Sequence, residues 1–201
     1  MKKLIFATGN QGKMKEIREI MGDLGMEILS MKEAGISLDI VEDGTTFEEN
    51  AIIKAKAVAA ALPEDMDAIV MADDSGLEVD ALNKEPGVYS ARYMGEDTSY
   101  RIKNMSLVER LEGVPVEKRT ARFVCSIAAA EKNGRVLTAT GVIEGKIGYE
   151  ERGEGGFGYD PIFYLPDMSR TTAELTAEEK NAISHRGNAL REIKKLLKEE
   201  K

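Results

Sequence analysis

Cysteine and histidine are nearly absent from this sequence of 201 residues, in which Cys125 and His185 are the only residues of their types. A disulfide needs two cysteines, and a structural zinc site needs about four cysteine or histidine ligands, so the chain can build neither. A haem-attachment motif and a choice of cysteine–histidine nucleophile pairs are excluded on the same ground. Cys125 alternates with Phe123 and Ile127, which favours a place in the core. The remaining catalytic chemistry is that of carboxylates, lysines and hydroxyl groups.

Long apolar runs are also missing. The longest, Ala57–Leu62 and Ala68–Ala72, fall well short of the ~20 residues that a transmembrane helix requires. The two lysines after Met1 are followed by only four apolar residues, too few for the apolar region of a secretory signal peptide. We therefore expect a cytoplasmic protein without a membrane partner.

Positive charge is in deficit, because 28 lysine and arginine residues stand against 36 aspartate and glutamate residues, for a formal charge of −8. Sequence-independent binding of nucleic acid relies on a broad basic surface, so nucleic acid is not an expected partner. A small anionic substrate remains compatible with this balance. Lysines can gather in one cleft, and carboxylates can recruit a divalent cation.

The length and the hydrophobic pattern indicate one α/β domain over residues 1–201. A chain of this size buries roughly 70% of its unfolded surface, so a core can form without disulfide or metal. Apolar periodicity predicts strands over 3–7, 68–72, 120–131, 135–147 and 162–165. It predicts helices over 13–24, 46–62, 98–111 and through most of the chain after 176, with capping boxes at Thr46/Glu49 and Thr176/Glu179. Asn133-Gly134 predicts a type I′ hairpin turn. These signals together favour a mixed sheet with flanking helices.

The first candidate site is the loop Thr8-Gly9-Asn10-Gln11-Gly12-Lys13, between a strand and the start of a helix. Free backbone N–H groups and the positive end of a helix dipole can hold phosphate there. The loop is not a Walker A motif, because its glycines are too close together and Met14 stands where a hydroxyl is needed. From the residues alone, an ordinary capped turn is as good an interpretation as a phosphate site.

The second candidate is Asp73-Asp74-Ser75-Gly76, which follows a buried strand. Functional groups of α/β sheets gather at such strand ends, and adjacent strand residues point to opposite faces. Only one of the two aspartates should therefore face a given site. The alternative is a strand-ending turn, which favours the same residue types.

Two further segments carry polar or aromatic signals. Gly153–Gly158 matches G-x-G-x-x-G letter for letter, but Pro161 follows almost at once and no strand leads into it, so we reject a dinucleotide site and expect a flexible loop beside Phe157. Lys180 and Ser184-His185-Arg186 place donors at the start of the final helix, where an anion or a carbonyl oxygen could bind. Solvated cap residues are the alternative there.

Six short motifs occur in one order over nearly the whole chain: Thr8-Gly-Asn-x-x-Lys13, Phe47-Glu-Glu-Asn-Ala51 with Lys54, Asp73-Asp-Ser-Gly76, Pro86-Gly-Val-Tyr-Ser-Ala-Arg92, Gly156-Phe-Gly-Tyr-Asp-Pro161 and Ser184-His-Arg186. In this combination the sequence resembles the inosine/xanthosine triphosphate pyrophosphatase family, which hydrolyses ITP, dITP and XTP to the monophosphate and pyrophosphate. The resemblance implies an elongated α/β fold with a mixed β-sheet and two lobes around a central substrate cleft. It also implies a magnesium cofactor and a homodimer.

The resemblance further implies a role for each motif. Asp74 would be the proton acceptor and a magnesium ligand. Many relatives have an acidic residue three positions before Gly44, where this chain has Val41, so we take the next residue, Glu42, as the second metal ligand. The remaining residues would bind substrate: Thr8, Gly9, Asn10, Gln11, Gly12, Lys13 and Lys54 the triphosphate, Ser75 the substrate, Phe157, Gly158, Tyr159 and Asp160 the base, and Lys180, His185 and Arg186 base or phosphate.

The base pocket would decide which nucleotide is cleaved. Donors placed for a 6-oxo group would face the 6-amino donor of adenine and leave a buried polar group unpaired, at about 1–3 kcal/mol per unmade bond. Two alternatives remain from the sequence: a hydrolase for triphosphates of another base, and a nucleotide sensor that binds without turnover.

Overall fold

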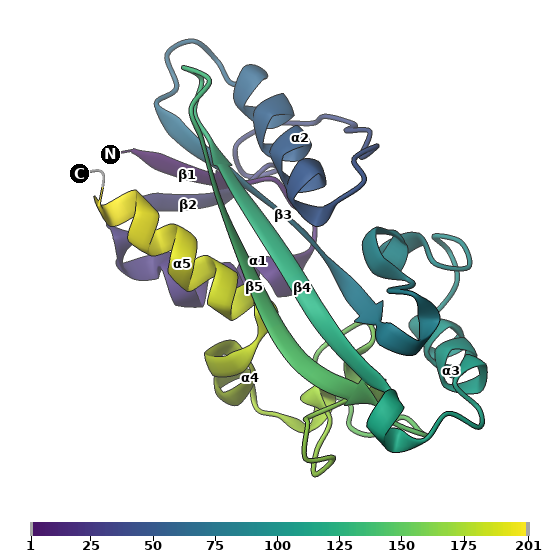
Figure 1. Ribbon diagram of the computed structural model, residues 1–201. Coiled ribbons are helices and arrows are strands. Elements are labelled where there is room, and N and C mark those ends of the chain that lie inside the picture. Colours follow the sequence, from purple (N-terminus) through teal and green to yellow (C-terminus); the bar gives the residue numbers. More distant parts are fainter. Residues whose placement is uncertain (1, 200–201) are drawn as a thin grey trace. The chain divides into compact units, whose positions relative to one another are not determined.

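The computed structural model describes residues 2–199, and it combines strand–helix alternation in the first part of the chain with the predicted hairpin and C-terminal helices (Figure 1). The strands are β1 (Lys3–Phe6), β2 (Glu27–Ser30), β3 (Ala68–Val79), β4 (Thr120–Ala130), β5 (Val136–Ile147) and β6 (Phe163–Tyr164). The α-helices are α1 (Gln11–Met21), α2 (Phe47–Ala60), α3 (Tyr100–Arg110), α4 (Ala177–Ile183) and α5 (His185–Glu199).

The six strands form one mixed sheet in the order β2-β1-β3-β4-β5-β6, so the predicted fold class is confirmed. Strand β1 runs parallel to both β2 and β3, whereas β5 and β6 are antiparallel. Strand β2 was not predicted, because its four residues are partly exposed and carry no clear alternation. Its pairing with β1 alone defines it.

The chain divides into two compact units, and strands β3, β4 and β5 each continue from one unit into the other. The first unit contains the chain up to Asp74, Cys125–Gly141, and the chain from His185 onward. The second unit contains Ser75–Val124 and Val142–Ser184. That residues 1–201 act as a single domain stays a prediction.

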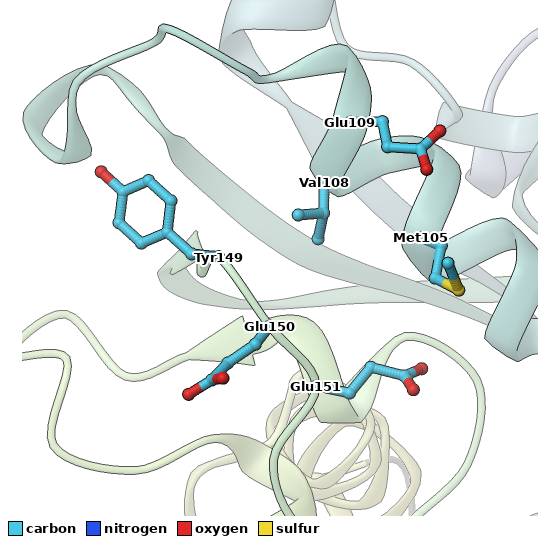
Figure 2. A pocket seen from close by; sticks show the side chains of 6 residues that line it. All are labelled: Met105, Val108, Glu109, Tyr149, Glu150 and Glu151. Carbon is cyan, nitrogen blue, oxygen red and sulfur yellow. The ribbon is translucent and has the colours of Figure 1, made fainter.

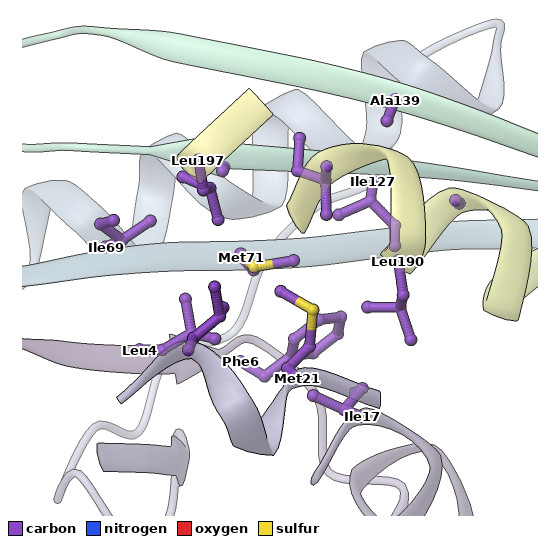
Figure 3. Close-up of a cluster of buried hydrophobic side chains, with 14 of the residues drawn as sticks. Leu4, Phe6, Ile17, Met21, Ile69, Met71, Ile127, Ala139, Leu190 and Leu197 are labelled. Carbon is purple, nitrogen blue, oxygen red and sulfur yellow. The ribbon is translucent and has the colours of Figure 1, made fainter. Parts of the chain in front are cut away.

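In the first unit, strand alternation sends side chains to two separate hydrophobic clusters. On one face, Leu4, Phe6 and Met71 pack with α1 and α5, which lie side by side (Figures 1 and 3). On the other face, Ile5 and Val70 pack with the alanine-rich stripe of α2. Cys125 belongs to the first cluster, as expected. Side chains that are adjacent along β3 therefore meet different helices.

The second unit has a core of its own. It is built by α3, β6 and the parts of β3, β4 and β5 that belong to this unit. Phe123 and Phe163 belong to this core, and their rings contact each other in a tilted arrangement with centroids 4.4 Å apart. Leu107 from α3 and Leu77 from β3 are completely buried beside them. This packing supports the segment 156–164 that carries the predicted base loop.

Two local predictions were wrong. Strand β3 does not end at Ala72 but continues to Val79, so Asp73 and Asp74 lie inside a strand and form no turn. The β4–β5 hairpin is present, but Gly134 has a positive φ (90°) and Asn133 does not, so the turn is not type I′. The Gly134 N–H instead donates to the Glu131 carbonyl, which is typical of a type I turn followed by a left-handed glycine.

The predicted capping boxes are confirmed. Thr46 caps α2 in a capping box with Glu49, and Thr176 caps α4 in the same way with Glu179. The glycine-rich segment leads into a short 3₁₀ helix, η5 (Asp160–Ile162), and not into a dinucleotide-binding helix. Within residues 2–199, no helix is both long and apolar enough to cross a membrane.

Candidate functional site

Asp74 is the centre of a group of polar side chains between β3 and α2, which we call the Asp74 group (Asp74, Asn50, Lys54 and Glu42). Asn50 Nδ2 donates a hydrogen bond of 3.0 Å to Asp74 Oδ2. Lys54 Nζ lies 3.0 Å from Glu42 Oε2 and 3.9 Å from Asp74 Oδ1. Asn50 and Lys54 are four residues apart in α2, so both side chains project from one face of the helix. Two carboxylates are thus held around one ammonium.

The segment that carries Glu42 is tied to the same helix. Asn50 Oδ1 accepts a hydrogen bond of 2.9 Å from the Gly44 N–H. A Cβ atom on residue 44 would lie only 2.7 Å from that oxygen, so the close approach requires glycine. Val41 is 75% exposed, whereas Glu42 turns toward Lys54. This geometry favours Glu42 over position 41 as the acidic partner of Asp74.

The charge balance of the Asp74 group favours a cation. Burial raises the pKa of the Asp74 carboxyl, and the negative charges of Glu42 and Asp73 add to this effect, against the opposing influence of Lys54 and Asn50. A carboxylate with a raised pKa is suited to accept a proton. In residues 2–199 no cluster of three or more His, Cys, Asp or Glu is arranged to hold a metal. Two carboxylates nevertheless fit Mg²⁺, which usually binds one or two carboxylates and completes its shell with water and substrate phosphates.

Asp73 points to the opposite face of β3 and contacts two cations. Lys13 Nζ lies 3.0 and 2.9 Å from its two oxygens, and Arg186 Nη2 and Nε lie 3.2 and 3.3 Å from Oδ2. Asp73 is only 1% exposed. Burial alone would raise its pKa, but the charges of Lys13, Arg186 and Lys54 lower it well below the usual range. The prediction that the two aspartates face different sites is therefore confirmed.

Arg186 is likewise buried and is held by carboxylates. Its Nη1 donates a hydrogen bond of 2.8 Å to Glu16 Oε2 of α1, in addition to its contacts with Asp73. The adjacent His185 is also buried, and its carbonyl packs so closely on Gly141 that a Cβ atom there would overlap it. The alternative of solvated cap residues is thus wrong for both side chains. That they contact base or phosphate stays a prediction.

The loop from Thr8 to Lys13 combines both interpretations that the sequence allowed. Asn10 Oδ1 accepts a 3.2 Å hydrogen bond from the Lys13 N–H, so the loop is a capped helix start. Thr8 Oγ1 accepts from the Asn10 N–H at 3.1 Å, and Gly9, Asn10, Gln11 and Gly12 are all exposed. The same turn therefore leaves backbone at the N-terminus of α1 open to an anion.

In the second unit, Asp160 organises the predicted base loop. Its Oδ2 accepts from the Phe157 N–H at 2.8 Å and from Lys180 Nζ at 2.7 Å, and its Oδ1 accepts from Thr172 Oγ1 at 2.7 Å. Lys180 Nζ lies 4.7 Å from the centroid of the Phe157 ring, which is 39% exposed. The loop thus offers an accessible aromatic ring next to a fixed ammonium.

Three further predicted residues belong to this unit. Tyr159 is buried and donates its hydroxyl hydrogen to the Ser90 carbonyl at 2.7 Å. Gly158 joins Tyr159 to Phe157 with a positive φ of 69°. Ser75 is partly exposed and follows Asp74 directly in β3.

The predicted site residues consequently fall into two sets. The first unit contains Thr8, Gly9, Asn10, Gln11, Gly12, Lys13, Glu42, Lys54, Asp74, His185 and Arg186, and the second contains Ser75, Phe157, Gly158, Tyr159, Asp160 and Lys180. Lys180 and Arg186 are close in sequence but belong to different units and contact different carboxylates, Asp160 and Asp73.

Sequence reasoning missed several partners of these residues. Asn50 had a recognisable signal, since it is a polar residue on the buried stripe of α2, one turn before Lys54. Glu16 and Thr172 had none, because each contacts a residue whose position depends on the fold and not on local spacing.

A cavity of about 230 Å³ lies within the second unit and contains none of the predicted site residues. Figure 2 shows its lining, which comes from α3 and from the chain after β5: Met105, Val108, Glu109, Tyr149, Glu150 and Glu151. Three carboxylates in the wall would repel a triphosphate. This cavity is therefore not a candidate for the substrate site.

Comparison with known proteins matches residues 4–196 to the model of the Ham1 family. The dITP/XTP pyrophosphatase of Desulforamulus reducens is 51% identical over 97% of this chain and 95% of its own length. The dITP/XTP pyrophosphatase of Bacillus subtilis is 49% identical over 98% of both chains. The structure of the Staphylococcus aureus Ham1 protein is 42% identical and covers 100% of both chains with a TM-score of 0.87. Both the sequence and the fold therefore show that this chain belongs to the Ham1 family.

Proposed function

We propose that this protein hydrolyses the deaminated purine nucleoside triphosphates ITP, dITP and XTP to the monophosphate and pyrophosphate. The observation that carries the proposal is the Asp74 group, in which two carboxylates, Asp74 and Glu42, are held around Lys54. Relatives named dITP/XTP pyrophosphatase that are 49–51% identical to this chain support the choice of substrate. Removal of such nucleotides would cleanse the nucleotide pool. No observation favours a hydrolase for another base or a sensor.

The triphosphate would bind at the N-terminus of α1. The loop Thr8–Lys13, which is exposed from Gly9 to Gly12, offers backbone N–H groups there, and the helix dipole adds a partial positive charge. Lys13 and Lys54 would neutralise phosphate oxygens. Asp73 and Glu42 contact these two ammonium groups at 2.9–3.0 Å and hold them in place before substrate arrives.

Magnesium is the proposed cofactor, with Asp74 and Glu42 as its protein ligands. The donor set is hard and oxygen-based, and the phosphates and water would complete the shell. When bound, magnesium would neutralise phosphate charge and so make the phosphorus more open to attack.

The chemical step would be attack of water on the α-phosphorus. Asp74 would orient the water and accept its proton while the new P–O bond forms. The bond from the α-phosphorus to the bridging oxygen then breaks, and pyrophosphate leaves with the electron pair. Lys13 and Lys54 would stabilise the charge that develops on the leaving group, so catalysis is chiefly positioning and electrostatics.

The base would stack on the exposed Phe157 ring, flanked by Gly158 and Tyr159. Lys180 is a donor-only group that Asp160 holds near this ring, so it can bond a 6-oxo oxygen but not the 6-amino group of adenine. Ser75, His185 and Arg186 would contribute further contacts to substrate. Discrimination against ATP would follow from the unpaired polar groups that adenine would leave.

A homodimer is the proposed assembly. Several large apolar side chains of the second unit are exposed, among them Tyr89, Met94, Ile102, Met105 and Tyr149, each 49–62% exposed. Burial of such side chains against a second copy would remove apolar surface from water. Light scattering coupled to size-exclusion chromatography would give the mass directly.

Hydrolysis in ¹⁸O-labelled water tests the proposed reaction. Attack on the α-phosphorus puts the label into inosine monophosphate and leaves pyrophosphate unlabelled. Label in pyrophosphate, or release of inosine diphosphate and inorganic phosphate, would refute the mechanism.

A further inference from the structure

Helix α3 has a buried face that is partly polar. Lys103 and Asn104 are each only 1% exposed, although both residue types are normally found at the surface. Lys103 Nζ donates to the Ala91 carbonyl at 2.6 Å and lies 4.9 Å from the Tyr100 ring centroid. Burial of a polar group costs free energy unless protein hydrogen bonds replace those to water, so both side chains depend on their partners here.

Asn104 reaches the segment next to the proposed base-stacking ring. Its Nδ2 donates to Glu151 Oε1 at 2.8 Å and to the Gly158 carbonyl at 3.3 Å. Both partners are acceptors, which fixes the orientation of the amide. Its Oδ1 is buried without a hydrogen-bond partner among the residues that the structure describes. The amide therefore lacks a hydrogen bond at its oxygen, while its nitrogen fixes the position of the Gly158 carbonyl.

Two side chains hold this peptide: Asp160 Oδ2 accepts from the Phe157 N–H, and Asn104 Nδ2 donates to the Gly158 carbonyl. Gly158 has a positive φ, and Gly155 and Gly156 precede Phe157, so this glycine-rich backbone depends on such contacts to keep one conformation. Tyr100, one turn before Asn104 in α3, packs against the same segment. Its ring lies edge-on to the Tyr159 ring, with centroids 5.3 Å apart, and would lie 3.5 Å from a Cβ atom on residue 158.

We propose that Asn104 is a positioning residue for purine discrimination, because it holds the Gly158 carbonyl and thereby sets the orientation of the Phe157 ring against the base. This inference rests on the proposed function of the Phe157–Asp160 loop. Asn104 itself touches no substrate. It acts through the loop, so its loss should affect recognition of the base and leave the phosphate end unchanged.

The test compares Asn104→Leu, which keeps the branching of the side chain but removes the amide, with Glu151→Gln, which keeps an acceptor for Asn104. For each enzyme, kcat and KM are measured on ITP and ATP, together with the inhibition constant of pyrophosphate, a probe without a base, at constant free Mg²⁺. Asn104→Leu should raise KM for ITP about tenfold, change kcat less than threefold, and leave the pyrophosphate constant and the kcat/KM for ATP within twofold. Glu151→Gln should resemble the wild type.

Two results would overturn the inference: an unchanged KM for ITP, or equal losses in ITP and pyrophosphate binding, which would indicate a general structural role. If Asn104→Leu does not fold, Asn104→Ala removes the same donor without added bulk, and the same selective rise in KM is expected. Failure of the wild-type enzyme on ITP would instead refute the proposed function, so the two failures are distinguishable.

Discussion

Asp73 and Asp74 are adjacent in β3, yet their carboxylates contact different helices. Asp73 accepts hydrogen bonds from Lys13 of α1 and Arg186 of α5, and Asp74 accepts one from Asn50 of α2. Their pKa values move in opposite directions, because Asp73 lies between two cations and Asp74 is desolvated beside other carboxylates. Strand alternation thus assigns one aspartate to the buried ion network and leaves the other for chemistry.

Asp74→Asn should lower kcat on ITP by at least ~10², because the amide cannot accept a proton. The melting temperature should stay the same or rise. A carboxyl whose pKa is raised in the folded state destabilises the protein when it is ionised, and at neutral pH the substitution removes that charge. Pyrophosphate release and thermal unfolding of the same preparation check both statements. Wild-type turnover in this variant would remove Asp74 from the mechanism.

Asp73→Asn should instead destabilise the fold, by about 3–5 kcal/mol, because it leaves the buried Arg186 without its principal counter-charge. Urea unfolding monitored by circular dichroism measures the change. If Asp73→Asn unfolds like the wild type while Asp74→Asn is destabilised, the two roles have been assigned to the wrong aspartates.

Lys13→Ala should raise KM for every nucleoside triphosphate by roughly 10- to 100-fold, the equivalent of a charge-assisted hydrogen bond of about 1.5–3 kcal/mol. The preference for ITP over ATP should not change, since the lysine is assigned to the phosphates. Lys15→Ala, an exposed lysine on the same helix, is the matched control. An altered base preference with an unaltered KM for ITP would contradict the phosphate role.

Gly156→Ala should raise KM for ITP about tenfold relative to Gly158→Ala, a difference of about 1.4 kcal/mol. Both glycines have a positive φ, 71° and 69°, so the backbone strain is matched. A Cβ atom on residue 156 would overlap Asp160 Oδ2 and lie 3.1 Å from Lys180 Nζ, whereas on residue 158 it would make ordinary contacts. Equal KM values for the two variants would show that the Asp160–Lys180 pair does not set the base site.

The sequence predicted most of the fold because its signals are local. The capping boxes of α2 and α4 and the apolar stripe of α1 each lie within a few residues, and each was found. Strand β2 was not predicted, because only its pairing with β1 defines it. The end of β3 was misjudged because Asp73 and Asp74 are typical turn residues, and here distant cations and amides stabilise them inside a strand.

The residues of the candidate site were found as motifs, but their partners were not. That Arg186 is held by Asp73 and Glu16 depends on the packing of α1 against α5, far apart in sequence. The hydrogen bond from Asn104 to the Gly158 carbonyl likewise joins residues that are 54 positions apart in the sequence. Local spacing indicates which side chains carry chemistry, and only the fold tells what holds them.

The most direct test of the proposed activity is product analysis on a panel of nucleoside triphosphates, with magnesium and after its removal by EDTA. We expect ITP, dITP and XTP each to yield one monophosphate and one pyrophosphate, at rates far above those of ATP. Turnover should stop without magnesium and return when magnesium is restored. Comparable rates on ATP, products other than monophosphate and pyrophosphate, or binding of ITP without any turnover would contradict the proposed activity.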